Sequence, residues 1–256
     1  MSSRTVILVT GANSGIGYET VIALATVLSD SHILLGSRTL EKGEQALSEI
    51  KSAHGSSLKS TISVIQIDVT DRESINATKE HIDSQFGKLD VLINNAGIIA
   101  YQTTDKLTAL RQTFETNVFG PAILTETLEP LLKKATKPYI IYVSSGQGSI
   151  TMRLDPEDPH RNVRGDAYRM SKSALNMLAA CQRYNSAEWG CRVMAFNPGW
   201  CISNLTGANG REARINGGAR DPKDPAIALV NIVSGKRDDD IEKNGMVDID
   251  GGILPW

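Results

Sequence analysis

The feature that most constrains the fold is an apolar segment that runs directly into a glycine-rich turn near the start of the chain. Residues Val6 to Thr10 are five apolar or β-branched residues in a row, which is typical of a strand buried on both faces. Three glycines follow in the spacing G-x-x-x-G-x-G, and residues 18–29 then have helical spacing. The sequence therefore predicts a strand, a tight turn and a helix in immediate succession.

This turn, which contains Gly11, Gly15 and Gly17, predicts an anion site. A strand that ends in such a turn and restarts as a helix points unpaired backbone N–H groups at one place, where a dinucleotide pyrophosphate can bind. The alternative is a glycine-containing turn in another kind of α/β protein, since the spacing differs from G-x-G-x-x-G. The strand–turn–helix context favours the dinucleotide.

Composition and charge exclude several classes of function. Of the 256 residues, 41% are hydrophobic and 22% are charged, as in ordinary soluble proteins. The net charge is −2 and the basic residues are scattered, so we expect neither nucleic acid nor a membrane as a partner. Cys181, Cys191 and Cys201 lack zinc-site spacing, which predicts no metal and reduced thiols. Since the chain enters its first strand at once, we expect no secretory signal and a cytoplasmic location.

Strand-like and helix-like segments alternate along nearly the whole chain. This alternation predicts right-handed crossovers and one doubly wound α/β domain over residues 1–256, with helices on both faces of a parallel sheet. The expected strands lie at 5–10, 32–36, 62–67, 89–93, 139–143, 192–196 and 246–249. The expected helices lie at 18–29, 40–53, 72–86, 106–134, 167–188 and 223–234.

Two stretches interrupt the alternation. Residues 151–167 contain two prolines and many charges, which predicts a surface loop. Residues 200–224 are glycine-rich and longer than a simple connection, which is typical of a functional loop or lid. Asp224 followed by Pro225 predicts an N-cap and a first-turn proline, where a helix restarts.

The ends of the second and third expected strands indicate how the adenosine half of a dinucleotide is bound. Arg38 follows the second strand, where an acidic residue would bind ribose hydroxyls. An arginine favours the 2′-phosphate of NADPH instead, and the alternative is a solvated surface arginine. Asp68 can accept a hydrogen bond from the adenine amino group, with Val69 against the ring. The alternative for Asp68 is a cap on the next helix.

The fourth and fifth expected strands end in small and polar residues. Residues 94–97, with the sequence NNAG, let backbone approach the nicotinamide ribose while the amide side chains join neighbouring strands. Ser144 and Ser145 end the fifth strand, where a hydroxyl can bind a substrate carbonyl. A serine at this place is otherwise ordinary turn chemistry.

Tyr168 and Lys172 lie four residues apart on a strongly periodic helix, so they share one face. A phenol ordinarily has a pKa near 10. A nearby ammonium favours the phenolate, so we expect the pKa of Tyr168 to be lowered toward neutrality. The pair alone is unspecific, because many helices carry Tyr and Lys at this spacing.

Taken together, these motifs resemble the short-chain dehydrogenase/reductase family. The resemblance rests on TGANSGIG, NNAG, a strand-end serine, YRMSK and NPG in this order, and it covers residues 5–252. It implies a single Rossmann domain with a seven-stranded parallel sheet.

The resemblance also implies roles for individual residues. Tyr168 would be the general acid/base, Lys172 would lower its pKa and bind the nicotinamide ribose, and Ser145 would bind the carbonyl because SGQG resembles the family's S-x-x-G. Asn117 would sustain a proton relay, and its alternative role is to stabilise a kink in a buried helix. Ser203 stands where threonine is commoner. The remaining cofactor-binding residues would be Gly11, Asn13, Ser14, Gly15, Ile16, Gly17, Asn95, Ala96, Gly97, Pro198, Gly199 and Ile202.

The chain departs from the family pattern between Ser145 and Tyr168, where 23 residues exceed the commonest spacing. Carbonyl-reductase-like members carry an insertion there, which can cover the helix face used for tetramers. We therefore expect a monomer or a homodimer. Met152, Asp155, His160 and Arg164 of the insert are candidates for the substrate cleft, although His160 is better explained as a surface residue. Trp200 either stacks on a flat substrate or anchors its loop.

The sequence thus predicts an NADP(H)-dependent oxidoreductase that reduces a ketone or aldehyde to an alcohol, reversibly. Two other classes stay open. One is a sensor that binds NADP(H) without turnover, and the other is an epimerase, dehydratase or cyclase that uses the same pocket. The set of Asn117, Ser145, Tyr168 and Lys172 argues against the sensor, which has no need of a proton relay.

Overall fold

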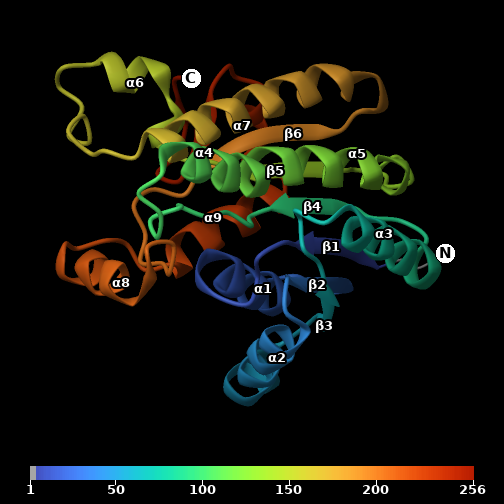
Figure 1. Ribbon diagram of the computed structural model, residues 1–256. Coiled ribbons are helices and arrows are strands. Elements are labelled where there is room, and N and C mark those ends of the chain that lie inside the picture. Colours follow the sequence, from blue (N-terminus) through green and yellow to red (C-terminus); the bar gives the residue numbers. More distant parts are fainter. Residues whose placement is uncertain (1–3) are drawn as a thin grey trace.

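Eight strands form one sheet in the computed structural model, which describes residues 4–256 (Figure 1). The strand order is β3-β2-β1-β4-β5-β6-β7-β8; the first seven strands are parallel, and β8 is antiparallel to β7. The strands are β1 (Thr5–Val9), β2 (Ser31–Ser37), β3 (Thr61–Gln66), β4 (Val91–Asn94), β5 (Tyr139–Val143), β6 (Arg192–Asn197), β7 (Met246–Asp248) and β8 (Ile253–Leu254). The seven expected strands are confirmed in place, and β8 corrects the predicted seven-stranded parallel sheet.

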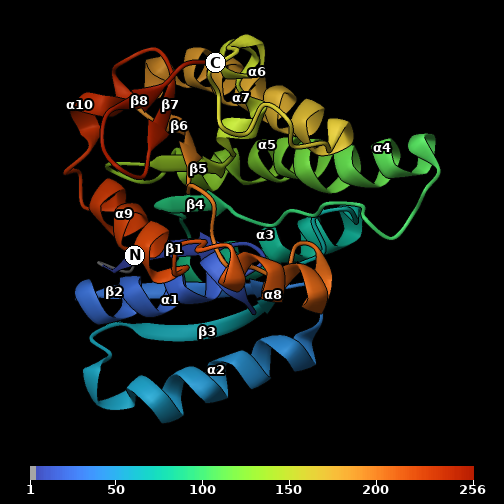
Figure 2. The same ribbon diagram turned by 90° about the vertical axis from the view of Figure 1, so that its left-hand side faces the viewer.

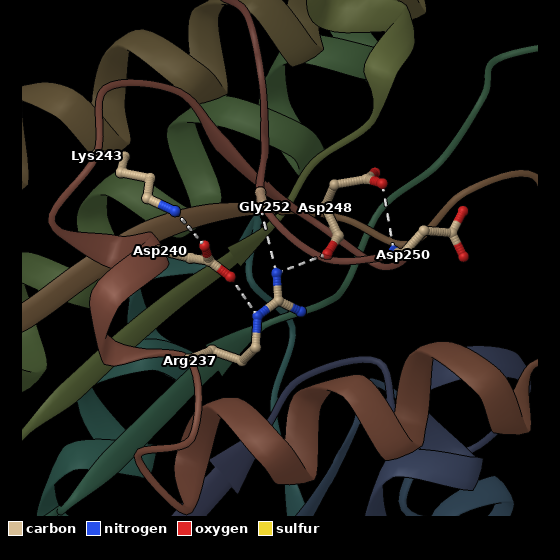
Figure 3. Close-up of polar contacts among 6 residues, drawn as sticks. All are labelled: Arg237, Asp240, Lys243, Asp248, Asp250 and Gly252. Carbon is tan, nitrogen blue, oxygen red and sulfur yellow. Dashed lines mark hydrogen bonds and ion pairs between the residues drawn. The ribbon is translucent and has the colours of Figure 1, made fainter.

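The eighth strand exists because the chain reverses at two glycines. Gly251 and Gly252 have φ values of +103° and +69°, which glycine adopts without strain. The guanidinium of Arg237 holds this turn, since it donates to the backbone oxygens of Asp248 (3.0 Å) and Gly252 (3.2 Å) (Figure 3). Its Nε also pairs with Asp240 at 2.5 Å. A two-residue strand fixed by such contacts has no periodic signal in the sequence.

Helices cover both faces of the sheet (Figures 1 and 2). α1, α2 and α9 pack on one face in a core that contains Ile7 and Val9, whereas α3, α5 and α7 pack on the other in a core that contains Val6 and Leu8. The alternation along β1 explains its continuous apolar run. The helices are α1 (Gly15–Val27), α2 (Leu40–His54), α3 (Arg72–Phe86), α4 (Lys106–Phe114), α5 (Gly120–Leu132), α6 (Ile150–Leu154), α7 (Asp166–Asn185), α8 (Gly207–Asn216), α9 (Lys223–Val233) and α10 (Asp238–Ile241).

Three expectations about helices need correction. The single helix expected at 106–134 is divided by a π-helical segment, Glu115–Phe119. The loop expected at 200–224 contains α8 and a parallel bridge between Cys201 and Arg220. Asp224 lies in the first turn of α9 and is not its N-cap, because the helix begins earlier, where Asp221 Oδ1 accepts from the Lys223 backbone N–H.

The carboxyl ends of the parallel strands meet at one edge, which faces the viewer in Figure 2. α6 lies there at the start of the predicted surface loop, and α8 lies at the same edge below it. Residues 151–167 are largely exposed, as the loop prediction requires. Across the residues that the structure describes, no helix is both long enough and apolar enough to span a bilayer.

Candidate active site

The glycine-rich turn between β1 and α1 has the geometry that a dinucleotide pyrophosphate needs. Gly15 has a φ of +59°, and a Cβ atom on Gly17 would lie 2.5 Å from Asn95 Nδ2 and 2.7 Å from the Gly11 oxygen. The Ser14 side chain makes no capping hydrogen bond within the described chain, and the first turn of α1 holds no acidic residue. The positive end of α1 is therefore open to an anion, so these residues fit the cofactor that the sequence predicts.

The residues expected at the adenosine end lie at the carboxyl ends of β2 and β3. The Arg38 side chain is exposed directly after β2. Asp68 does not cap α3, because its Oδ1 accepts from the backbone N–H (2.9 Å) and the hydroxyl (2.7 Å) of Thr70. The N-cap of α3 is Asp71. Val69 is buried beside Asp68, at the same edge of the sheet as the glycine-rich turn.

The amides after β4 join neighbouring elements as expected. Asn95 Nδ2 donates to the Thr10 oxygen at 2.8 Å, and the backbone N–H groups of Asn95 and Ala96 each donate to Thr10 Oγ1 at 3.0 Å. Asn94 Nδ2 donates to Thr125 Oγ1 at 3.1 Å. These bonds hold the backbone of residues 95–97 against the end of β1, beside the glycine-rich turn.

The segment after β6 contains a polar atom that lacks a partner. The Ser203 hydroxyl is buried and makes no hydrogen bond with any part of the chain that the structure describes. Pro198, Gly199 and Ile202 lie before it in the same segment, where Gly199 has a φ of +72° and the Ile202 N–H donates to the Arg220 oxygen. A buried hydroxyl without a partner is costly, so this group fits a polar ligand such as a carboxamide.

Trp200 anchors its loop, which is one of the two roles considered for it. A Cβ atom on Gly217 would lie 2.6 Å from the Trp200 ring, so the indole packs against the end of α8. The Trp200 backbone oxygen also accepts from the Arg220 N–H at 2.9 Å. The later part of the segment 200–224 therefore packs against its first residue, Trp200.

Tyr168 and Lys172 lie one turn apart on α7, with Lys172 Nζ 5.5 Å from the centre of the Tyr168 ring. Lys172 is only 4% exposed, and its Nζ donates to the Val143 oxygen at 2.8 Å. Burial raises the pKa of Tyr168 to about 12, while hydrogen bonding to Ser145 and the charge of Arg214 act in the opposite direction. Burial lowers the pKa of Lys172 to about 8. The expected lowering of the tyrosine pKa is thus wrong for the chain by itself, because desolvation outweighs the neighbouring charges.

The two serines after β5 have different surroundings. Ser144 is buried, and its hydroxyl donates to Asn176 Oδ1 at 2.5 Å. The Ser145 hydroxyl accepts from the Gln147 N–H at 3.2 Å and interacts with Tyr168. Of the two hydroxyls, the structure brings that of Ser145 to the phenol.

Asn117 lies in the π-helical segment and is fully buried. Its Oδ1 accepts from the Ile98 N–H at 2.8 Å, and its Nδ2 donates to the Ile98 oxygen and to Ser171 Oγ, each at 3.0 Å. These bonds fit the kink-stabilising role. The relay role also has a basis, because a Cβ atom on Gly97 would lie 3.4 Å from Asn117 Oδ1 and 3.7 Å from Lys172 Nζ.

The insert contributes less to this site than expected. Met152 is half-buried and lies near Gly146, whereas Asp155, His160 and Arg164 are exposed. His160 is a surface residue whose backbone oxygen accepts from Arg169. Exposed side chains of this kind do not line a closed cleft.

A cavity of about 270 Å³ adjoins Tyr168, between α4 and the start of α7. Its walls are largely apolar, with Lys106 and Asp166 as charged residues. Ile99, Ala100, Ala109, Leu110, Thr113, Gly165, Ala167 and Tyr168 complete its lining. The Thr113 hydroxyl is buried without a hydrogen-bond partner among residues 4–256. The cavity can hold the apolar part of a small molecule next to the phenol.

No pattern in the sequence predicted Arg214 as a site residue. It lies on α8, donates to the Cys201 oxygen at 3.0 Å and lies close enough to Tyr168 to act on its pKa. No periodic signal predicted α8, so no argument from the residues could place this guanidinium at the site.

Comparisons with known proteins agree with this geometry. The family model for short chain dehydrogenases matches residues 5–213. Short-chain dehydrogenase anuI of Penicillium roqueforti is 36% identical over 224 residues, which cover 84% of this chain and 86% of that protein. Short-chain dehydrogenase/reductase tropE of Talaromyces stipitatus is 32% identical and covers 100% of this chain and 99% of its own.

Two solved structures are similar over the full length. The NADPH-bound carbonyl reductase from chicken fatty liver has a TM-score of 0.74 at 25% identity, with 100% of both chains covered. Carbonyl reductase Sniffer of D. melanogaster has a TM-score of 0.77 at 26% identity, with 99% of both chains covered.

Proposed function

This chain belongs to the short-chain dehydrogenase/reductase family of oxidoreductases, and from that premise we propose that it reduces a ketone or aldehyde to an alcohol with NADPH. The observation that carries the proposal is the meeting of Tyr168, Ser145 and Lys172 at the carboxyl edge of the sheet. The open N-terminus of α1 lies at the same edge. This arrangement combines a dinucleotide site with a proton donor.

The chain's own groups supply positioning and the proton. When bound, NADPH supplies the hydride that adds to the carbonyl carbon. Ser145 donates a hydrogen bond to the carbonyl oxygen as negative charge develops there, and Tyr168 transfers its phenolic proton to that oxygen. Lys172, with a pKa of about 8, is mostly an ammonium at neutral pH and favours the phenolate that remains. The product is an alcohol.

NADPH is preferred over NADH in this proposal because of Arg38. The guanidinium is exposed after β2, where it can reach a 2′-phosphate. The carbonyl reductase from chicken fatty liver was solved with NADPH bound, which supports the same choice. The residues proposed to hold the cofactor are those of the glycine-rich turn, Asp68, Val69, residues 95–97 and the segment from Pro198 to Ser203.

The substrate and assembly are proposed on the same grounds. The cavity beside Tyr168 supports a small carbonyl or alcohol compound with an apolar group. The insert before Tyr168 supports a monomer or a homodimer, since it lies against the start of α7, where Arg169 donates to the His160 and Val163 oxygens. Three free cysteines support a reducing compartment, in keeping with a cytoplasmic location.

The test is to mix purified protein with NADPH and a panel of ketones and aldehydes and to follow NADPH oxidation. We expect stoichiometric conversion to alcohol. Tyr168→Phe should lower kcat by about 10³-fold, since a positioned proton donor contributes roughly 10²–10⁴-fold, while the Kd for NADPH stays almost unchanged. Substrate conversion without net NADPH oxidation would indicate an isomerase-type enzyme, and undiminished turnover by Tyr168→Phe would overturn the role of the phenol.

A further inference from the structure

The loop that carries Ser145 is attached to β6 in two different ways. On one side of Ser145, the Ser144 N–H donates to the Phe196 backbone oxygen at 2.8 Å, as in a regular ladder between parallel strands. On the other side, the Gly146 N–H donates at 2.8 Å to a side chain, Asn197 Oδ1. Ser145 is thus held between one backbone bond and one side-chain bond.

The side-chain bond replaces a ladder bond that β6 cannot provide. In a parallel ladder the next bond would join the Gly146 N–H to the oxygen of residue 198. The chain turns away at Pro198 and Gly199, whose φ is +72°, and the Pro198 oxygen accepts from Cys201 Sγ at 3.0 Å. The side-chain oxygen of Asn197 takes the place of this missing backbone oxygen and accepts from the Gly146 N–H.

The Asn197 amide is itself held by the C-terminal hairpin, residues 246–254. Its Nδ2 donates to Asp248 Oδ1 at 2.7 Å, so both ends of the amide have partners and its orientation is fixed. The Asp248 Oδ2 accepts from the Asp250 N–H, and Arg237 holds the backbone oxygens of Asp248 and Gly252 (Figure 3). Leu254 of β8 also lies against Gly146. The hairpin therefore reaches the Ser145 loop through one asparagine.

We propose that Asn197 and Asp248 are positioning residues, which set the Ser145 hydroxyl in its catalytic place through the Gly146 N–H. The inference rests on the proposed function, since it assigns these residues to the same reaction. Without the bond from Asn197, the peptide after Ser145 is free to move, and the hydroxyl leaves hydrogen-bond reach of the carbonyl oxygen. A misplacement of about 1 Å can lower the rate by about 100-fold.

The donor and acceptor of the Asn197–Asp248 pair can be exchanged, which gives a decisive set of variants. Asn197→Ala removes the bond to Gly146. Asn197→Asp keeps an acceptor for Gly146 but places a carboxylate against Asp248. Asp248→Asn leaves one acceptor oxygen for two donors, Asn197 Nδ2 and the Asp250 N–H, so it tests Asp248 by itself. The double variant N197D/D248N reverses the pair, because the new amide at 248 donates to the new carboxylate at 197.

We expect N197A and N197D to lower kcat about 10- to 100-fold, with the Kd for NADPH within about twofold of wild type. D248N should also lower kcat, whereas the double variant should retain wild-type kcat within about threefold, as should Asn244→Ala, an exposed asparagine before β7. Full activity of N197A, or a double variant no better than N197D, would overturn the proposal. If N197A does not fold, the comparison of N197D with the double variant decides.

Amide hydrogen exchange at Gly146 tests the inference without turnover. Its N–H should be protected in the wild type and the double variant, and should exchange at least about tenfold faster in N197A or, if that variant does not fold, in N197D. Equal exchange in all variants would overturn the role of Asn197. If the wild type oxidised no NADPH with any carbonyl, the proposed function would be overturned. The exchange rates would still show whether Asn197 holds the Gly146 N–H.

Discussion

The carboxyl ends of β1 and of β5 both face the active site, but they are built differently. The turn after β1 is made of backbone: glycines at three positions, an uncapped helix and a close approach to Asn95. The end of β5 and the loop after it are held by side chains from elsewhere: Lys172 donates to the Val143 oxygen, and Asn197 accepts from the Gly146 N–H. The conformation of the first region comes from glycines within one short stretch, against which Asn95 packs from a distant part of the chain. The second region has no such local device and depends on side-chain contacts that span 29 and 51 positions.

The two ends also differ in charge. The turn after β1 offers only the partial charges of backbone N–H groups, which do not titrate. The end of β5 carries Lys172, whose pKa burial lowers to about 8, and Tyr168, whose pKa burial raises to about 12. Binding of a pyrophosphate at the turn after β1 should thus be insensitive to pH. At the end of β5, burial sets the pKa values of the groups that exchange protons.

Gly17→Ala should disrupt the glycine-rich turn after β1 more than any other substitution considered. The new Cβ would lie 2.5 Å from Asn95 Nδ2 and 2.7 Å from the Gly11 oxygen, so the turn must move. We expect the free energy of unfolding to fall by about 3 kcal/mol, with a matching loss of NADPH affinity. Urea unfolding and a fluorescence titration with NADPH measure the two effects.

Gly15→Ala is the matched control for this variant. Its Cβ meets no atom within 4 Å, so only the φ of +59° opposes the substitution. The expected cost is about 1 kcal/mol. Equal losses in both variants would show that the close approach at Gly17 does not matter.

The burial of Lys172 at the end of β5 can be tested by comparing the pH dependence of stability of the wild type and Lys172→Met. The pKa of Lys172 is about 8 in the folded chain and 10.5 when exposed, so between these values the unfolded chain binds one more proton. The free energy of unfolding of the wild type should rise relative to K172M by about 2 kcal/mol between pH 8 and pH 9.5. Urea unfolding at several pH values measures the difference. Parallel curves for the two proteins would contradict the burial of the ammonium, and Lys59→Met, at an exposed position, should show no such difference.

Arg38→Ala should have the smallest effect of the three. We propose that this guanidinium contacts the 2′-phosphate, so its removal should lower the ratio of kcat/KM for NADPH over NADH about tenfold. The measurement is steady-state kinetics with both cofactors, and Lys59→Ala, an exposed lysine at the opposite end of β3, should keep the wild-type ratio. If this ratio of kcat/KM values were unchanged in R38A, Arg38 would be a solvated surface residue without a role in cofactor choice.

Local patterns predicted the elements well where each element depends on its own residues. The apolar run of β1 and the helix 72–86 were predicted closely, since burial on both faces and helical spacing leave direct signals. The π-helical segment around Asn117 and the short helix α8 were not predicted, because a few side-chain contacts and not periodicity stabilise them. The pKa of Tyr168 was predicted in the wrong direction, since spacing along a helix says nothing about desolvation.

What the sequence alone determined is the order of the elements, the glycine-rich turn and the residue types available for chemistry. These follow from neighbours along the chain, through periodicity, φ preference and the lack of a Cβ atom. The tertiary structure decided where the helix around Asn117 is interrupted, how far burial shifts the pKa values of Tyr168 and Lys172, and how the C-terminal hairpin reaches Gly146. Such properties depend on which distant groups share a volume from which water is excluded, and only the packing of the whole sheet determines that.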